Sequence, residues 1–176
     1  MTRDELRQLI EIASLIADDD VIVIGSQSIL GTFRESELPA RATMSVEADL
    51  AFLDDVDNVK SDRVDMDIGE GSSFDALRGY YGQGVDLSVA TLPDGWRERL
   101  VDLPSPSGMG RCLEPHDLAL SKLVAGREKD FEFVFALLES RLLDLGILIA
   151  RINDLPITGL QRKRILNWLD WAKRTR

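Results

Sequence analysis

Apolar residues recur at helical spacing near the start of the chain and then give way to a short, wholly apolar run. Thr2 and Glu5 have the spacing of a capping box, and the apolar positions that follow them are Leu6, Ile10, Ala13 and Ile16. We predict a helix of about four turns that ends at the acidic residues 18–20. Residues 21–24 (VIVI) predict a strand buried on both faces, and residues 26–33 predict a short helix.

A second strand is predicted by the alternation of side chains in residues 45–53, SVEADLAFL. Glu47 and Asp49 lie two positions apart, so on a strand they project from the same face, with their Cα atoms about 7 Å apart. The sequence therefore predicts a carboxylate pair on one face of this strand.

The chain between the second strand and the C-terminal third is acidic at first and then rich in glycine. We predict loops through residues 54–84, with one helical turn near residues 74–77. Residues 85–89 (VDLSV) alternate again and predict a third strand that carries Asp86. Proline, serine and glycine dominate residues 103–110, which predicts an irregular connection.

The last third of the chain has the apolar spacing of helices, predicted at residues 116–125, 128–143, 145–152 and 158–173. Pro115 suits a first helical position, and Gly126 suits a helix end. Strands come first and helices last, which is typical of an α+β fold. We expect residues 1–112 to form a mixed β-sheet core flanked by helices. Residues 113–176 are expected to form a helical part packed on that core, in a single structural unit.

Length and composition are those of one ordinary globular domain: 176 residues, 44% hydrophobic and 30% charged. No stretch approaches the roughly eighteen apolar residues of a membrane span, and acids replace the basic start of a signal peptide. We therefore expect a cytoplasmic protein with no membrane contact. The single cysteine, Cys112, excludes an internal disulfide, and the single histidine, His116, excludes sites built on several histidines. We expect His116 to be exposed in the first turn of its helix.

The net charge of −10 argues against general affinity for nucleic-acid backbones. Residues 159–176 differ from the rest, because they hold six basic residues and one acid, a net charge of +5 against −15 elsewhere. Trp168 and Trp171 lie in the same segment. Two interpretations stay open for this tail, a surface that guides an RNA end and a solvated amphipathic helix.

Candidate chemistry begins at Gly25–Ser26, where the first strand meets the following helix. Backbone N–H groups and a hydroxyl at a helix N-terminus favour an anion, and glycine permits close approach. Phosphate is the natural ligand for such a turn. Serine is also a common N-cap for purely structural reasons, and that alternative stays open.

The carboxylate pair Glu47 and Asp49 offers hard oxygen ligands at a spacing that suits Mg²⁺ when nucleotide phosphates complete the coordination. A two-metal site needs a third carboxylate from a neighbouring strand. Asp86 is the candidate, and Glu70 is its rival. The alternative is a solvated strand face in an acidic region.

Taken together, a strand that ends in Gly-Ser and a carboxylate pair on the next strand resemble the nucleotidyltransferase fold of the DNA polymerase β type. The order GSQSIL, SVEAD, GEGSSF, GYYGQGV, LPDGWRERL and CLEPHDLALSKLVAGREKDFEFV is similar to a bacterial family of nucleotidyltransferase-like proteins. That family is related to the nucleotidyltransferase toxins of abortive-infection (AbiEii-type) toxin–antitoxin systems. The resemblance covers roughly residues 20–140.

The resemblance implies a role for each matching residue. Gly25 and Ser26 would bind the phosphates of a nucleoside triphosphate, and Glu47 and Asp49 would hold Mg²⁺. Lys122 would meet the phosphates. Asp130 would assist the chemistry, with Arg127 and Lys129 as further phosphate contacts. The resemblance also implies an acceptor hydroxyl on tRNA or protein, and a cognate antitoxin as partner.

The sequence departs from the Asp-x-Asp pattern of active transferases, because Glu47 occupies the first position. Two hypotheses follow: a Mg²⁺-dependent nucleotidyltransferase, and an inactive domain of the same fold that binds a nucleotide or a partner protein. The aromatic residues also allow two interpretations, since Tyr80, Tyr81 and Trp96 suit either stacking on a base or packing in the core.

Overall fold

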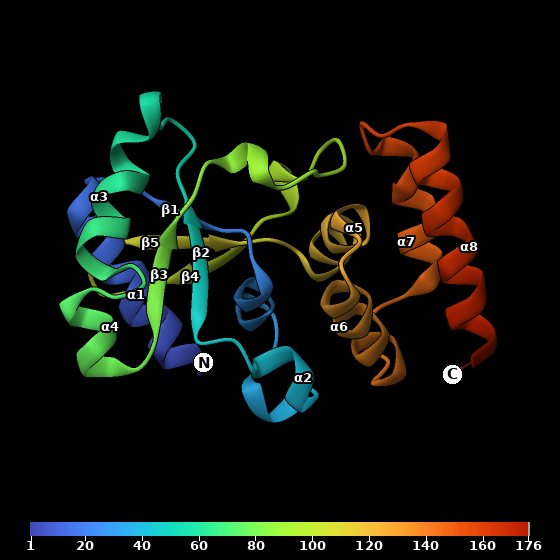
Figure 1. Ribbon diagram of the computed structural model, residues 1–176, viewed down its shortest axis with the longest axis horizontal. Coiled ribbons are helices and arrows are strands. Elements are labelled where there is room, and N and C mark those ends of the chain that lie inside the picture. Colours follow the sequence, from blue (N-terminus) through green and yellow to red (C-terminus); the bar gives the residue numbers. More distant parts are fainter. Residues whose placement is uncertain (176) are drawn as a thin grey trace.

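The computed structural model describes residues 1–175, so Arg176 of the basic tail lies outside the described residues. A five-stranded mixed sheet in the order β3-β2-β1-β5-β4 forms one half of the molecule (Figure 1). The strands are β1 (Val21–Val23), β2 (Glu47–Ala51), β3 (Tyr81–Gly84), β4 (Val101–Pro104) and β5 (Met109–Cys112). This sheet and its helices confirm the predicted α+β fold.

The central strand β1 pairs antiparallel with β2 and parallel with β5. β2 in turn pairs in parallel with β3, which places Glu47 opposite Tyr81 and Asp49 opposite Gln83. On β2, Ala48 and Leu50 are fully buried, whereas Glu47 and Asp49 are partly accessible. Since successive side chains on a strand point to opposite faces, the two carboxylates share the face away from Leu50, as predicted.

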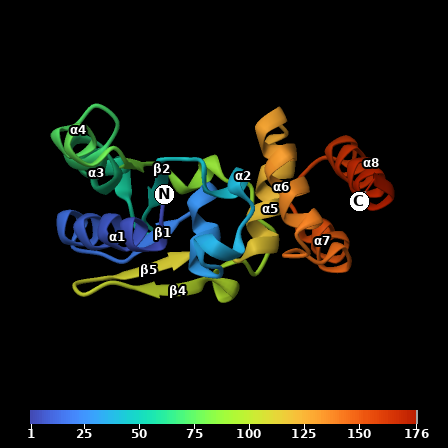
Figure 2. The same cartoon turned by 90° about the horizontal axis from the view of Figure 1, so that it is seen from below.

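Two helices cover the face of the sheet to which Leu50 points. α1 (Arg3–Ala17) contacts β1, β2 and β5, and α3 (Val59–Ile68) contacts β3 and α1. Figure 2 shows α1 and α3 together with the short α4 (Ser73–Arg78) on the sheet side of the molecule. The capping box of Thr2 and Glu5 is confirmed, because each side chain accepts the other's backbone N–H. α1 therefore begins where the sequence predicted.

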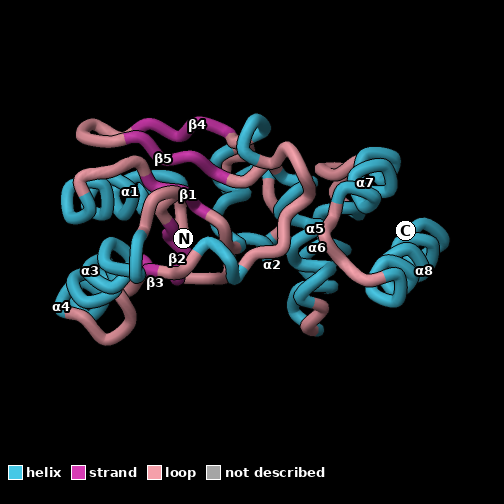
Figure 3. Tube along the Cα trace, turned by 90° about the horizontal axis from the view of Figure 1, so that it is seen from above, coloured by secondary structure: helices cyan, strands magenta, loops and turns pink. Residues whose placement is uncertain are grey.

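The C-terminal helices are α5 (Pro115–Ala125), α6 (Glu128–Glu139), α7 (Leu145–Arg151) and α8 (Gly159–Thr175). They gather at the end of the molecule opposite the strands (Figure 3). α6 is shorter than the predicted 128–143, and Arg141 beyond its end has a left-handed backbone with φ of 58°. The last strand ends at Cys112, three residues before α5 begins.

The predicted strand at residues 85–89 is wrong. The third strand is β3, four residues earlier, and residues Leu87–Val89 form a 3₁₀ turn capped by Asp86. β3 has the sequence YGQG, so apolar alternation does not mark it. Its glycines serve close packing, because a Cβ on Gly84 would lie 1.9 Å from the carbonyl oxygen of Ser61 on α3.

Two predicted loops are also wrong. Residues 54–70 contain α3, whose buried positions Ser61, Val64 and Ile68 are outnumbered by its polar residues. Residues 103–110 contain parts of the hairpin β4–β5, in which Leu103 pairs with Gly110. In both segments a narrow buried stripe is enough for a regular element, because α1 covers it: Ile10 lies against Gly110.

The basic tail forms α8, whose buried stripe is Ile165, Leu169 and Ala172. Arg164 Nη2 donates to the carbonyl oxygens of Leu123 at 3.2 Å and Val124 at 2.9 Å, so this helix caps the end of α5. None of the helices within residues 1–175 is both long enough and apolar enough to cross a membrane.

Candidate functional site

A cleft of about 630 Å³ lies between the sheet and the C-terminal helices. Its sheet side comprises the Gly25–Ser26 turn, the carboxylate face of β2, and Val85, Val89 and Ala90. Its helical side comprises α5 and the start of α6, and the short helix α2 (Ala40–Thr43) borders it as well. The residues predicted to bind phosphate or to assist the chemistry, and the pair Glu47 and Asp49, all line this one cleft; Asp86 and its rival Glu70 do not.

Gly25 lies two residues beyond the end of β1 and directly against Asp49. Its backbone is extended (φ −84°, ψ −166°), which any residue adopts, so backbone freedom does not explain the glycine. The lack of space for a side chain explains it, because a Cβ at position 25 would lie 1.5 Å from Asp49 Oδ2 and 2.5 Å from Asp49 Cγ. Ser26 then begins the 3₁₀ helix Ser26–Gly31. The turn and the carboxylate therefore form one compact surface.

Glu47 and Asp49 stand side by side on this surface. Burial and the charge of Asp49 raise the pKa of Glu47. Burial also raises the pKa of Asp49, although the charges of Lys122, Arg127 and Lys129 oppose the rise. Within residues 1–175 neither carboxylate forms an ion pair. A bound cation would relieve this repulsion between two partly desolvated anions.

Lys122 approaches from α5 on the opposite wall, with only 11% of its side chain exposed. Its Nζ lies 3.4 Å from Asp130 Oδ1 and 4.7 Å from the ring centre of Phe133. Burial lowers the pKa of Lys122 despite the nearby charges of Asp130 and Asp49. The lysine is therefore held inside the cleft and is not directed to solvent.

Asp130 organises the corner between α5 and α6. Its side chain is 1% exposed and accepts from Arg127 Nε at 2.7 Å as well as from Lys122. Burial alone would raise the pKa of Asp130, but the Arg127 hydrogen bond and the Lys122 charge lower it. Gly126 makes the turn between the helices with a left-handed φ of 69°. Asp130 thus fixes two cations at the cleft, and Arg127, 62% exposed, reaches its mouth.

The candidates for a third carboxylate lie outside the cleft. Asp86 is exposed and caps the Leu87–Val89 turn, its Oδ1 accepting from the Ser88 N–H at 2.7 Å. The strand on which its predicted role rested is absent, and the turn directs it to its own backbone instead. Glu70 is also exposed and outside the lining, although its charge contributes to the raised pKa of Glu47.

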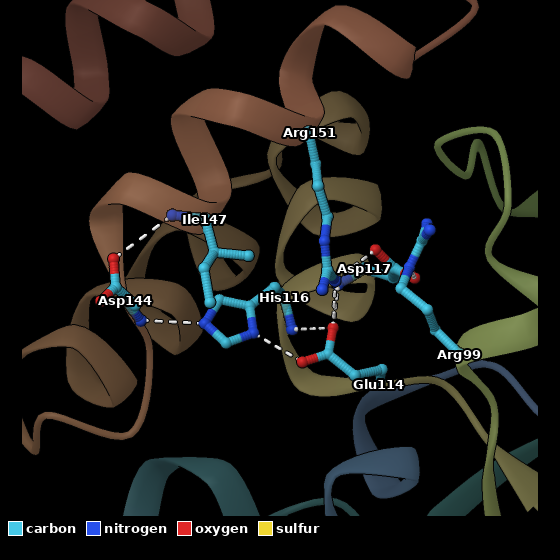
Figure 4. Close-up of polar contacts among 7 residues, drawn as sticks. All are labelled: Arg99, Glu114, His116, Asp117, Asp144, Ile147 and Arg151. Carbon is cyan, nitrogen blue, oxygen red and sulfur yellow. Dashed lines mark hydrogen bonds and ion pairs between the residues drawn. The ribbon is translucent and has the colours of Figure 1, made fainter.

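His116 is not the exposed residue that the sequence predicted, because 12% of its side chain is accessible. Its Nδ1 lies 2.6 Å from Glu114 Oε1, and its Nε2 accepts the N–H of Asp144 at 2.9 Å (Figure 4). Arg151 of α7 pairs with Glu114 and, at 2.9 Å, with Asp117. These contacts hold the start of α5, and with it Lys122, against α7.

Sequence reasoning missed one charged lining residue, Arg41 of α2. It sits in a four-residue helix between Pro39 and Met44, and no motif or apolar spacing marks it. The aromatic residues considered for stacking on a base differ in their surroundings. Tyr80 is 7% exposed and packs edge-on against Phe74, and Trp96 lines a second, smaller cavity that shares Ala90 with the cleft.

Residues 4–175 match a protein family described as a nucleotidyltransferase of unknown function (DUF6036). The chain belongs to this family. Membership supports the nucleotidyltransferase character that the motifs predicted, while the relationship to AbiEii-type toxins stays a prediction. No curated protein and no solved structure matches the chain.

A nucleotidyltransferase of this fold implies Mg²⁺, so the donors of the cleft decide whether the ion fits. Within the described part of the chain, no group of three or more His, Cys, Asp or Glu side chains is arranged for a metal. Glu47 and Asp49 supply two carboxylates without ion-pair partners, beside an open cleft. That set suits Mg²⁺, which accepts one or two protein carboxylates when substrate phosphates and water complete its octahedron.

Proposed function

We propose that the protein is a Mg²⁺-dependent nucleotidyltransferase that moves a nucleoside monophosphate from a nucleoside triphosphate to an acceptor hydroxyl. One observation carries the proposal: Gly25 and Ser26, the pair Glu47 and Asp49, and the cations on α5 and α6 line one cleft. The cleft thus offers carboxylates for a metal ion opposite cations for phosphates. Family membership points to the same chemistry.

In this proposal Glu47 and Asp49 hold Mg²⁺, which neutralises phosphate charge and makes the acceptor hydroxyl a better nucleophile. Gly25 and Ser26 present backbone N–H groups and a hydroxyl to the triphosphate. Lys122 and Arg127 stabilise the charge that develops on the leaving pyrophosphate, and Asp130 keeps both in place. The acceptor oxygen attacks the α-phosphorus directly, so no side chain is needed as a nucleophile.

The acceptor is proposed to be a hydroxyl of tRNA or of a protein, and the biological role that of a toxin controlled by an antitoxin. This part rests on the resemblance of the motif order to abortive-infection toxins. The acidic surface disfavours RNA except at α8, where the basic residues gather. Label transfer into total RNA and into lysate protein separates the two acceptors.

The test is incubation with each α-labelled nucleoside triphosphate, Mg²⁺, total RNA and lysate protein. Asp49→Asn is expected to lower transfer at least about 100-fold, because removal of a metal ligand abolishes charge neutralisation at the reacting phosphate. Asp86→Asn is the matched control, since asparagine caps a turn equally well and Asp86 lies outside the cleft. Undiminished transfer by Asp49→Asn would refute the metal role.

A second candidate function is a binding module without turnover. It is favoured by the absence of a three-carboxylate cluster within residues 1–175 and by glutamate at position 47. The extra methylene of Glu47 shifts its carboxylate by more than about 1 Å relative to aspartate. Mg²⁺-dependent uptake of a triphosphate without transfer of label to any acceptor would establish this function instead.

A further inference from the structure

Arg41 is the one charged residue of α2, and it lies where the sheet side and the helical side of the cleft meet. α2 contacts both the Ser26–Gly31 helix and α6, and Arg41 itself lines the cleft. Its guanidinium forms an ion pair with Glu132 on α6. Glu132 is outside the lining. The ion pair therefore bridges the cleft wall and draws Arg41 toward α6.

The other cations of the cleft are differently placed. Lys122 and Arg127 share Asp130, whose carboxylate is almost fully buried and cannot be given up to solvent. The partner of Arg41 is instead 42% exposed, and the Arg41 side chain is 47% exposed. Ion pairs at such exposure contribute little to stability, so a phosphate can replace Glu132 at low cost.

The balance of charge in the cleft also favours a cation that can leave its own carboxylate partner and bind a phosphate. The lining holds four cationic side chains (Arg41, Lys122, Arg127, Lys129) and three carboxylates (Glu47, Asp49, Asp130). A triphosphate with one Mg²⁺ adds about two negative charges, and a guanidinium binds phosphate oxygens through two parallel N–H donors. Lys129, at the start of α6, carries an ammonium group and lacks this pair of parallel donors.

We propose that Arg41 is a further triphosphate-binding residue, which Glu132 holds at the cleft edge until a nucleotide exchanges with it. The inference rests on the proposed function of the cleft and adds a specific ligand contact to it. Exchange of partners means that the two members of the ion pair act on substrate affinity in opposite directions. A simple structural brace would make them act in the same direction.

The experiment measures Mg²⁺-dependent binding of the α,β-methylene analogues of the four ribonucleoside triphosphates by calorimetry, so it needs no acceptor. Arg41→Gln is expected to weaken binding about tenfold, the loss of a charged hydrogen-bond pair. Glu132→Gln is expected to tighten binding about two- to fivefold, because Arg41 no longer has to leave a partner. In the double variant, binding should be as weak as in Arg41→Gln.

The matched control is the pair Arg111 and Asp20, with side chains 38% and 46% exposed and neither in the cleft. Arg111→Gln and Asp20→Asn should leave the dissociation constant unchanged. Weaker binding in both Arg41→Gln and Glu132→Gln, or no change in either, would overturn the inference and leave the proposed function standing. No uptake of any analogue by the unaltered protein would overturn both.

Discussion

Gly25 and Asp49 show how one residue can determine the position of another. The carboxylate of Asp49 occupies the space that any Cβ at position 25 would take. The glycine therefore has a steric role in the cleft, in addition to the phosphate contact proposed for its backbone N–H. Sequence reasoning assigned glycine here to close approach of a ligand, and the structure adds close approach of a carboxylate.

Replacement of Gly25 by alanine is expected to displace the Asp49 carboxylate, since an overlap at 1.5 Å requires one of the two groups to move. Mg²⁺-dependent triphosphate binding, measured by calorimetry, should weaken at least about tenfold, while circular dichroism should show a folded protein. Gly159→Ala is the control, because a Cβ at Gly159 meets nothing within 4 Å. Equal affinity in Gly25→Ala and Gly159→Ala would disprove the steric role.

At the same scale, the residues that the sequence predicted correctly are those fixed by local rules. Glu47 and Asp49 share a face because strand periodicity is two, and Gly126 ends α5 because glycine tolerates a left-handed backbone. Arg41 could not be predicted in this way. Its place in the cleft depends on how α2 packs against α6, and no short stretch of sequence encodes that contact.

Among the elements, those with strong apolar periodicity were predicted well and those shaped by packing were not. α1 and α5 follow from their spacing and caps. β3 does not follow from the sequence pattern, because its two glycines leave it without an apolar stripe. The glycines instead leave room for α3 to pack closely on the strand. Because β3 was missed, the third strand was predicted at residues 85–89 instead, and Asp86 was predicted to be a strand carboxylate near the metal.

α8 illustrates an element that acts on the site without entering it. Arg164 donates to two carbonyls at the end of α5, and a Cβ on Gly126 would lie 2.7 Å from its Nη2. The guanidinium therefore braces the turn that leads from Lys122 to Arg127. A cation at a helix C-terminus also interacts favourably with the helix dipole.

Arg164→Gln is expected to cost about 1–2 kcal/mol of unfolding free energy, the loss of two charged hydrogen bonds and the dipole interaction. The melting temperature should fall by about 2–8 °C, and the KM for triphosphate should rise because Lys122 and Arg127 lose their brace. Lys163→Gln, at the exposed neighbouring position, should change neither quantity. If Arg164→Gln lowered the unfolding free energy no more than Lys163→Gln does, the capping role would be contradicted.

In the whole molecule, the cleft exists because the helical part is held at a fixed position beside the sheet (Figure 1). The order of strands and helices in the sequence predicts two such parts, but it does not say which residues join them. Apolar residues of both parts belong to one core, and a buried charge network also joins them. Arg99, from the segment before β4, donates to Asp117 of α5 at 2.7 Å, and Arg151 joins the same carboxylate from α7. Asp117 is 1% exposed.

Glu114 belongs to the same charge network, because Arg151 pairs with both Glu114 and Asp117, and it makes this network sensitive to acid. Burial alone would raise the pKa of Glu114, but hydrogen bonds from His116 and Arg151 lower it to about 2. A carboxyl with a lowered pKa stabilises the fold above its unfolded pKa of about 4.5, and this contribution is lost as pH falls toward 2. Urea unfolding between pH 7 and 2.5 should therefore show a steeper loss of stability below pH 4.5 for the unaltered protein than for Glu114→Gln. Glu139→Gln, at an exposed glutamate, should follow the unaltered protein, and parallel curves for Glu114→Gln would exclude this role.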